Sequence, residues 1–410
     1  MSTESETNGP TPGMVECRVC RTEVPEGEYC GLCGLPLKDH DGVAGPDWLR
    51  IRAYSASPGE HLLRPNLVSS LFPHLSPSSR MPFLLGLGVI FVALVAASLF
   101  RLPAALITVA ALGLPLLFLI YLQESDVYDD VPTGTLVATA GLGIGLGVGW
   151  VLLTGAMVAQ AYDVGLGAGI AGSRILRDGL GIPIVGLLLM LAPVVIVRLV
   201  RPGQREALDG FAIGALGALM FTAAAQMTRL APQFAGGMIA KSRPMSGLMV
   251  EAGIRGIAVP LTAAAVGGLI GTALWFARPA NKKDQHRRGV RIVLTGFALV
   301  VMTMYALLGL VDVARFPQLL QLAMHLTVSA IALLALRVGL HLALLHEAHD
   351  EILSDEPLLC THCGHVVPDM AFCVACGAAT RASSRSSRKA RRDIRPVRVE
   401  TGPEPGTDER

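Results

Sequence analysis

The sequence has few charged and few aromatic residues for its length. Of 410 residues, 16% are charged and 5% are aromatic, whereas 52% are hydrophobic. A soluble domain of this size could not bury so much apolar surface, so these shortages exclude an ordinary soluble globular fold. They favour a chain that lies in a lipid bilayer. The 45 glycines and 26 prolines suit membrane helices that approach one another closely through small residues.

The first 80 residues also lack any apolar segment long enough to cross a membrane, and they are rich in proline and polar side chains. Because these residues also contain no apolar core segment, we expect no cleavable signal peptide at the start of the chain. We therefore expect the N-terminus to remain on the side of the membrane on which it is synthesised.

Eight runs of about 18 or more mainly apolar residues follow. The expected transmembrane helices are 82–100, 102–122, 134–158, 181–200, 208–228, 254–277, 290–311 and 318–341. The sequence thus predicts an all-α polytopic membrane bundle over residues 82–345. The first two runs are separated so briefly, at residues 101–103, that they form either a tight hairpin or a broken re-entrant pair.

An even number of spans returns both termini to one face of the membrane. Arg and Lys are concentrated in the loops on that face and in the C-terminal tail, and the positive-inside rule places such loops in the cytoplasm. We expect a multi-pass protein of the cell (plasma) membrane with both termini cytoplasmic.

Alternating glycines occupy residues 141–149 of the third run. A phosphate-binding glycine loop requires a strand before it and the start of a helix after it, and neither context is present. We expect these glycines to flatten one face of a helix for close packing.

The motif with the most specific chemistry is a cysteine repeat at the two ends of the chain, Cys17-x2-Cys20-x9-Cys30-x2-Cys33 and Cys360-x2-Cys363-x9-Cys373-x2-Cys376. Four thiolates on two tight turns can surround one tetrahedral Zn²⁺. A glycine after each second pair, Gly34 or Gly377, lets the backbone curl so that amide hydrogens face the sulfur atoms. We predict two structural zinc ions, bound by these eight cysteines in ribbons at 14–36 and 357–379.

Two disulfides per cluster are the alternative, but the expected cytoplasmic location favours reduced thiols. Four thiolates close the coordination shell, so a catalytic metal is not expected. His362 and His365 lie within the second ribbon and are alternative ligands, although four cysteines already suffice. Neither ribbon has enough apolar residues to fold without its metal.

The remaining segments are expected to be disordered or to link the folded parts. We expect disorder at 1–13, a linker at 37–81 and a basic disordered tail at 380–410. The tail, from Arg381 to Arg398, is a candidate for contact with anionic lipid. The first ribbon disfavours nucleic acid because it carries four acidic residues, Glu16, Glu23, Glu26 and Glu28.

Polar side chains inside the membrane are functional candidates by default. The expected spans contain Gln226, His325 and Arg337. Acidic residues lie at span ends, at Asp163, Asp209 and Asp312, and the last helix leaves the membrane through His341, His346, Glu347 and His349. A metal site at these histidines is conceivable, although the end of an amphipathic helix explains them as well.

Several segments of the middle of the chain resemble the PrsW family of intramembrane proteases. The resemblance covers residues 105–277 and rests on Gly113-Leu-Pro115, Tyr121 to Asp130, Leu191-Ala-Pro193, Asp209 to Gly214 and Arg255 to Pro260. It implies a catalytic Glu pair after the Ala-Pro, a further Glu and a later His. The matching positions here are Ile196, Val197, Ala225 and Ala263, so every expected catalytic position is aliphatic.

The sequence favours a non-enzymatic membrane scaffold or regulator that presents two cytoplasmic zinc ribbons to a protein partner, on a PrsW-like pseudoenzyme bundle. Two alternatives stay open. One is an active intramembrane metalloprotease of the PrsW type, using acids such as Glu124, Asp126, Asp129 and Asp130 with the terminal histidines. The other is a transporter, for which broken helices with paired polar groups are expected.

Overall fold

The computed structural model separates the chain into two units, which are described here one at a time. One unit contains residues 63–349 and the other combines both chain ends, residues 1–62 and 350–410. The described residues are 13–18, 21–37, 55–57, 60–61, 67–73, 80–100, 102–124, 130–162, 177–200, 206–235, 245–276, 286–314, 316–347, 357–360, 363–380, 389 and 393. Cys20, His362, Asp126, Asp129, the expected disordered segment 1–12 and nearly all of the basic tail therefore lie outside the description.

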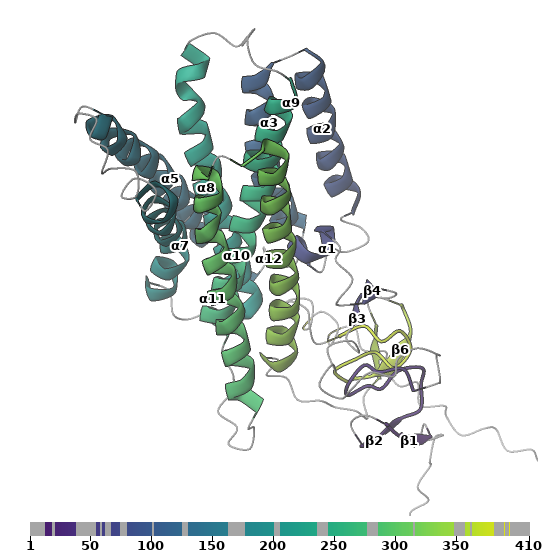
Figure 1. Cartoon of the computed structure of the whole chain (residues 1–410). Coiled ribbons are helices and arrows are strands. Elements are labelled where there is room, and N and C mark those ends of the chain that lie inside the picture. The colour runs from purple at the N-terminus through teal and green to yellow at the C-terminus, as the bar shows by residue number, and fades with distance from the viewer. Residues whose placement is uncertain are drawn as a thin grey trace, which may run out of the picture. The chain divides into compact units, whose positions relative to one another are not determined.

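The larger unit is a bundle of helices (Figure 1). Its elements are α1 (Leu67–Leu71), α2 (Arg80–Leu99), α3 (Pro103–Glu124), α5 (Thr133–Tyr162), η3 (Arg177–Gly181), α7 (Ile182–Val200), α8 (Ala207–Ala235), α9 (Met245–Ala252), η4 (Gly253–Ala258), α10 (Val259–Trp275), α11 (His286–Val313) and α12 (Gln318–Glu347).

Within the described residues of this unit, eight stretches of helix are long and apolar enough to cross a membrane. They coincide with the eight predicted spans, which confirms the predicted fold class and makes the chain a membrane protein. Large apolar side chains such as Leu85 and Leu199 are more than half exposed on the outside of the bundle. Lipid is the natural contact for such a surface.

The centre of the bundle is the pair α8 and α10. Both helices are mostly buried, and in the middle of Figure 1 they are surrounded by the other spans. Glycines make this contact possible: a Cβ atom on Gly271 would lie 1.8 Å from the carbonyl oxygen of Gly210, and one on Gly214 would lie 2.0 Å from that of Gly267. The two backbones thus touch directly, as in small-residue interfaces of membrane helices.

The alternating glycines of α5 are divided between two environments. Gly143 and Gly147 face the backbone of α8, where an added Cβ would lie 2.7 Å and 2.5 Å from carbonyl oxygens of Gly217 and Phe221. The other three glycines of the run, 141, 145 and 149, have no atom within 4 Å of an added Cβ. The close-packing prediction is therefore correct for one side of this helix.

Two spans are not regular α-helices throughout. The fourth begins with the π-helical turn η3, and the sixth consists of α9, η4 and α10 in succession. π-helical turns of this kind are frequent at functional sites because they redirect side chains. The first two spans, α2 and α3, are full helices that pack on each other, so they form a helical hairpin.

Polar contacts tie the last helix to the start of the bundle. Nη1 of Arg337 donates to the hydroxyl of Ser69 on α1, although this arginine is only 1% exposed. Farther along α12, Oε2 of Glu347 accepts a hydrogen bond of 2.6 Å from the backbone amide of Ala207 at the start of α8. A carboxylate at a helix N-terminus is stabilised by the free amides there. Arg337 and Glu347 therefore have structural roles.

The smaller unit contains short antiparallel strand pairs. Strands β1 (Met14–Glu16) and β2 (Glu23–Pro25) form one pair, and β5 (Pro357–Leu359) and β6 (Val366–Pro368) form another. A third pair, β3 (Ser55–Ser57) with β4 (Glu60–His61), lies in the predicted linker.

Candidate metal centres and a polar pocket in the bundle

The two cysteine repeats fold in the same way. In the first, Val15 pairs with Val24, and in the second, Leu358 pairs with Val367 at the corresponding position. Each repeat also has one isolated antiparallel β-bridge near its C-terminal end, between Tyr29 and Pro36 in the first and between Phe372 and Ala379 in the second. The internal repeat seen in the sequence is therefore also a structural repeat.

Tight turns position the cysteines. The backbone amides of Gly34 and Gly377 donate to the carbonyl oxygens of Cys30 and Cys373, both at 2.8 Å. Both glycines adopt a left-handed backbone, with φ of 72° and 70°. This conformation is available to glycine without steric cost, as expected for a turn that wraps amides around a metal-binding sulfur.

The sulfur atoms gather into two clusters. Cys360, Cys363, Cys373 and Cys376 lie within 4.8 Å of one another, as do Cys17, Cys30 and Cys33 of the first ribbon. None of the seven described cysteines is in a disulfide. Both clusters are close enough to bind a metal ion.

The sulfur separations fit a tetrahedral metal. Sγ of Cys17 is 3.6 Å from that of Cys33, and the pairs Cys360–Cys376 and Cys363–Cys373 are separated by 3.9 Å and 3.8 Å. A tetrahedron with metal–sulfur bonds of about 2.3 Å has edges of about 3.8 Å. A disulfide would require sulfur atoms about 2.05 Å apart. The donor set and dimensions of the second ribbon thus fit a closed four-thiolate site, with His365 outside it, and the three described cysteines of the first ribbon fit part of such a site.

Proximity couples the thiols to one another. A hydrogen bond shared with Cys33 lowers the pKa of Cys30 to about 5, and the same bond raises the pKa of Cys33. In the second ribbon, a hydrogen bond with Cys360 is the main cause that raises the pKa of Cys373 to about 11, and it also raises that of Cys376. Several thiolates this close together repel one another unless a cation lies between them.

One turn differs between the ribbons and supplies a test. Gly364 has φ of 72°, and Arg21, at the corresponding turn of the first ribbon, has φ of 53°. An L-residue other than glycine is strained there, so Arg21→Gly should stabilise the first ribbon by about 1 kcal/mol. The reverse change, Gly364→Arg, should destabilise the second ribbon by a similar amount. Competition with a metal chelator, measured for each variant, will show these opposite shifts, and shifts of the same sign would contradict the strain argument.

The two ribbons pack against each other through reciprocal backbone hydrogen bonds. The amide of Tyr29 donates to the carbonyl oxygen of Val374 at 3.0 Å, and the amide of Phe372 donates to that of Gly31 at 2.9 Å. Tyr29 and Phe372 are equivalent in the repeat, as are Gly31 and Val374. Such exchange of equivalent partners is the pattern of a two-fold interface.

Side chains repeat the same reciprocity. The position of a Cβ on Gly34 would be 2.7 Å from the Phe372 ring, and that of a Cβ on Gly377 would be 2.7 Å from the Tyr29 ring. Buried residues from both ribbons form one hydrophobic cluster, which contains Cys17, Val24, Cys30, Cys360, Val367, Met370, Cys373 and Val374. We call this two-ribbon body, residues 13–37 with 357–380, the double ribbon.

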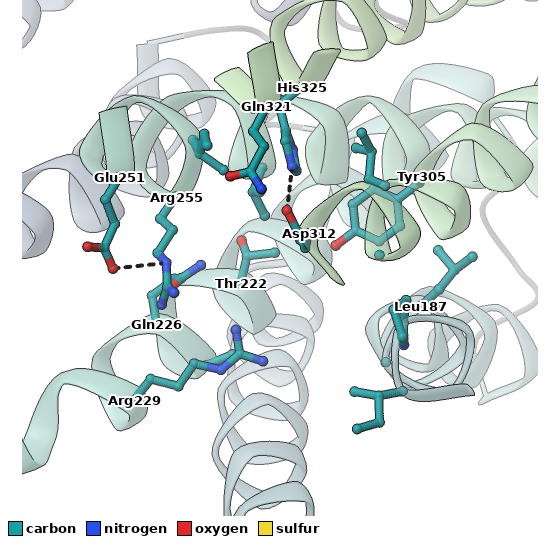
Figure 2. Close-up of a pocket in the computed structure, with 18 of the residues that line it drawn as sticks. Leu187, Thr222, Gln226, Arg229, Glu251, Arg255, Tyr305, Asp312, Gln321 and His325 are labelled. Carbon is teal, nitrogen blue, oxygen red and sulfur yellow. Dashed lines mark hydrogen bonds and ion pairs between the residues drawn. The ribbon is translucent and has the colours of Figure 1, made fainter. Parts of the chain in front are cut away.

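The second candidate site is a polar pocket in the bundle, with a volume of about 510 Å³ (Figure 2). It lies among the start of α7, the second half of α8, the α9–η4 segment, the end of α11 and the start of α12. Because successive spans run in opposite directions, these parts all lie at one face of the bundle, opposite to the face where α12 ends.

Charged side chains line this pocket in pairs. Nε of Arg255 on η4 lies 3.3 Å from a carboxylate oxygen of Glu251, one helical turn earlier. Nε2 of His325 on α12 donates to Oδ1 of Asp312 on α11 at 2.9 Å. Figure 2 shows both pairs and a further arginine, Arg229 of α8, in the same pocket.

The pocket thus gathers some of the predicted polar residues and leaves others elsewhere. Gln226, Asp312 and His325 line it, whereas Arg337 and Asp209 are buried outside its lining. Glu124 and Asp130 do not line it either. The side chains of Asp163, His346 and His349 are outside the described part of the chain.

Several polar groups of the pocket are not among the candidates that the sequence indicates. Arg229 and Glu251 lie between the predicted spans 208–228 and 254–277, and Tyr305 lies within the predicted span 290–311, but all three line the pocket. Arg255 carried a usable signal, because it is a basic residue inside an expected apolar run.

The four positions that the PrsW resemblance singles out are not gathered in this pocket. Ala225 lines it, whereas Ile196 and Val197 lie near the end of α7, away from its pocket-lining start, and Ala263 is buried in α10. The described residues therefore place no ionisable group at these positions.

The fold and the sites together define a polytopic membrane protein with paired cysteine ribbons that can bind metal. No protein-family model, curated protein or solved structure matches the chain. The relationship to the PrsW family consequently stays a prediction.

Proposed function

We propose that this protein is a non-enzymatic membrane scaffold or regulator that presents the double ribbon, with one Zn²⁺ in each half, to a protein partner. The observation that carries the proposal is the reciprocal packing of two ribbons encoded at opposite ends of the chain. A metal site needed only for local stability would not require two copies joined through matching hydrogen bonds. A rigid recognition surface would benefit from them.

The pairing of the ribbons also supports the proposed topology. Two chain ends can meet in one body only if they leave the membrane on the same side, as eight spans require. We place that side in the cytoplasm of a cell with the protein in its plasma membrane, because of the basic loops. Cytoplasmic thiols stay reduced, and Zn²⁺ is the metal that commonly occupies a tetrahedral site of four cysteines.

The exposed strands of the double ribbon favour a protein as its partner. Leu359 and Val366 face each other across β5 and β6 and are 37% and 56% exposed. At the equivalent position of the first ribbon, Glu16 and Glu23 are opposite each other and exposed. Like charges in this arrangement repel and would be relieved by a basic partner. An apolar pair and an acidic pair suit a protein surface and disfavour nucleic acid.

The test is affinity capture of the full chain from membranes, with the strand surface altered. We expect Leu359→Ser combined with Val366→Ser to lose a bound protein that the unaltered chain retains, while both metal ions remain. Met14→Ser is the matched control, because Met14 is 58% exposed on a strand of the other ribbon. It should retain the partner.

Two outcomes would contradict the proposal. A preparation in which no bound protein depends on Leu359 and Val366 would leave the double ribbon without a recognition role. Cleavage of a membrane-spanning peptide by the purified chain would favour the active intramembrane protease instead.

A further inference from the structure

The polar pocket adjoins an apolar groove. The groove has a volume of about 600 Å³ and is lined by Met249, Val250, Pro317, Gln318, Leu319 and Leu322, from α9 and the start of α12. Val250 and Gln318 line both spaces, so the two are neighbours. Met249 and Leu319 are 54% and 73% exposed, which opens the groove to the surrounding lipid.

The lining of the polar pocket is balanced in formal charge, with Arg229 and Arg255 against Glu251 and Asp312, but its two arginines are not both in ion pairs. Among the described residues, Arg229 makes no hydrogen bond or ion pair, and Arg255 pairs with Glu251 through Nε. In Figure 2 the two arginines extend into the pocket from different helices. Guanidinium groups in such positions match the oxygen atoms of a phosphate.

The pocket also contains buried polar atoms that lack a partner within the described chain. They are Oε1 of Gln226, a residue that is 5% exposed, and Nδ1 of His325, a residue that is 1% exposed. Oε1 of Gln226 can only accept a hydrogen bond, whereas Nδ1 of His325 accepts in the neutral ring and donates in the protonated ring. Buried acceptors are normally satisfied, so Oε1 of Gln226 indicates a ligand that offers a hydrogen-bond donor.

We propose that the pocket and the groove together bind one anionic phospholipid from the leaflet at the face of the bundle where α12 begins. Its phosphate lies between Arg229 and Arg255, a headgroup hydroxyl donates to Oε1 of Gln226, and an acyl chain occupies the groove between α9 and α12. Basic pockets between membrane helices bind lipid headgroups on the cytoplasmic or matrix side of other membrane proteins, and the same chemistry is proposed here at the opposite face. This site belongs to the bundle and does not depend on the function proposed for the double ribbon.

The other ligand classes fit less well. A divalent metal would need several carboxylates or histidines close together. Among the described residues, only the two cysteine clusters bring several metal-binding side chains that close to one another. A small soluble anion would use the arginines but would leave the adjoining groove without a role. The groove is thus the feature that favours a lipid.

The test measures binding to the purified full chain in a neutral detergent by native mass spectrometry. The probes are dioleoylphosphatidylglycerol, dioleoylphosphatidylcholine and glycerol 3-phosphate. We expect one phosphatidylglycerol per chain, bound more tightly than either other probe. Arg229→Gln should weaken it at least about tenfold, since hydrogen bonds to charged groups contribute on that scale. Leu322→Trp, which fills the groove, should weaken it as well.

The matched control is Arg177→Gln. Arg177 begins the fourth span at the same face of the bundle, is exposed and pairs only with the neighbouring Asp178 among described residues. It removes the same charge outside the pocket and should leave binding unchanged. Arg229 makes no hydrogen bond or ion pair with the described residues, so Arg229→Gln should leave the fold intact. If Leu322→Trp does not fold, Met249→Trp blocks the groove from its exposed side.

Three results would overturn the proposal. Equal loss of binding in Arg177→Gln and Arg229→Gln would show attraction to charge in general. Equal binding of phosphatidylglycerol and phosphatidylcholine would show that the arginines do not select an anion. Binding of glycerol 3-phosphate as tightly as the lipid, unaffected by the groove variants, would assign the pocket to a soluble anion.

Discussion

Replacing Cys360 and Cys373 together with serine should release one metal ion per chain and unfold the second ribbon while the bundle stays inserted. Structural zinc contributes about 10–16 kcal/mol to the folding of small four-ligand modules, and this ribbon has few other sources of stability. The helices draw their stability from the bilayer and from contacts with one another. Metal analysis of the purified chain, together with hydrogen exchange of the two units, will measure both effects.

The same variant should weaken metal binding by the intact first ribbon. Unfolding of the second ribbon removes the hydrogen bonds between Tyr29 and Val374 and between Gly31 and Phe372. Each such bond contributes about 1 kcal/mol, so a loss of affinity of about tenfold or more is expected. His365→Ser is the control, because His365 lies outside the sulfur cluster. This variant should retain two metal ions. Two metal ions in the double cysteine variant would refute the assignment of these ligands.

Substitution of a single glycine at the centre of the bundle should have the second large effect. In Gly271→Ala the new Cβ would lie 1.8 Å from the carbonyl oxygen of Gly210, so α8 and α10 must separate. Overpacking of a tight core costs about 1–3 kcal/mol and occasionally more, and we expect about 3 kcal/mol because backbone obstructs the new atom. Thermal unfolding in detergent will show the loss.

The control for this substitution is Gly296→Ala on α11, where an added Cβ meets nothing within 4 Å. Alanine is a better helix former than glycine by about 1 kcal/mol, so this variant should be unchanged or slightly stabilised. The two substitutions are chemically identical, and a difference in sign between them isolates the contact between α8 and α10. Equal effects would show that glycine acts here only through helix propensity.

The helical spans could be predicted because their signal is local. A run of apolar residues is long enough to cross a bilayer regardless of its neighbours, and all eight predictions have a matching helix. The ends were less well predicted. α12 continues to Glu347 and α8 to Ala235, several residues beyond the expected apolar runs. A helix can extend past the hydrocarbon region because its backbone hydrogen bonds form equally well between polar residues.

The glycine run of α5 shows what a local sequence pattern does not determine. Its composition predicted a close helix contact, but the positions at the contact, Gly143 and Gly147, depend on how the helix is rotated against α8. Rotation is set by the packing of both helices together. A single helix sequence does not contain that information.

By itself, the sequence determined the membrane class, the eight spans and the two sets of cysteines that can bind metal, because hydrophobic length and ligand spacing are properties of short segments. Only the tertiary structure decided that the ribbons at opposite ends of the chain form one body. It also decided that Gln226, Arg229, Arg255 and His325 share a pocket. These features join residues far apart in the chain, and such contacts arise only when separate elements pack against one another.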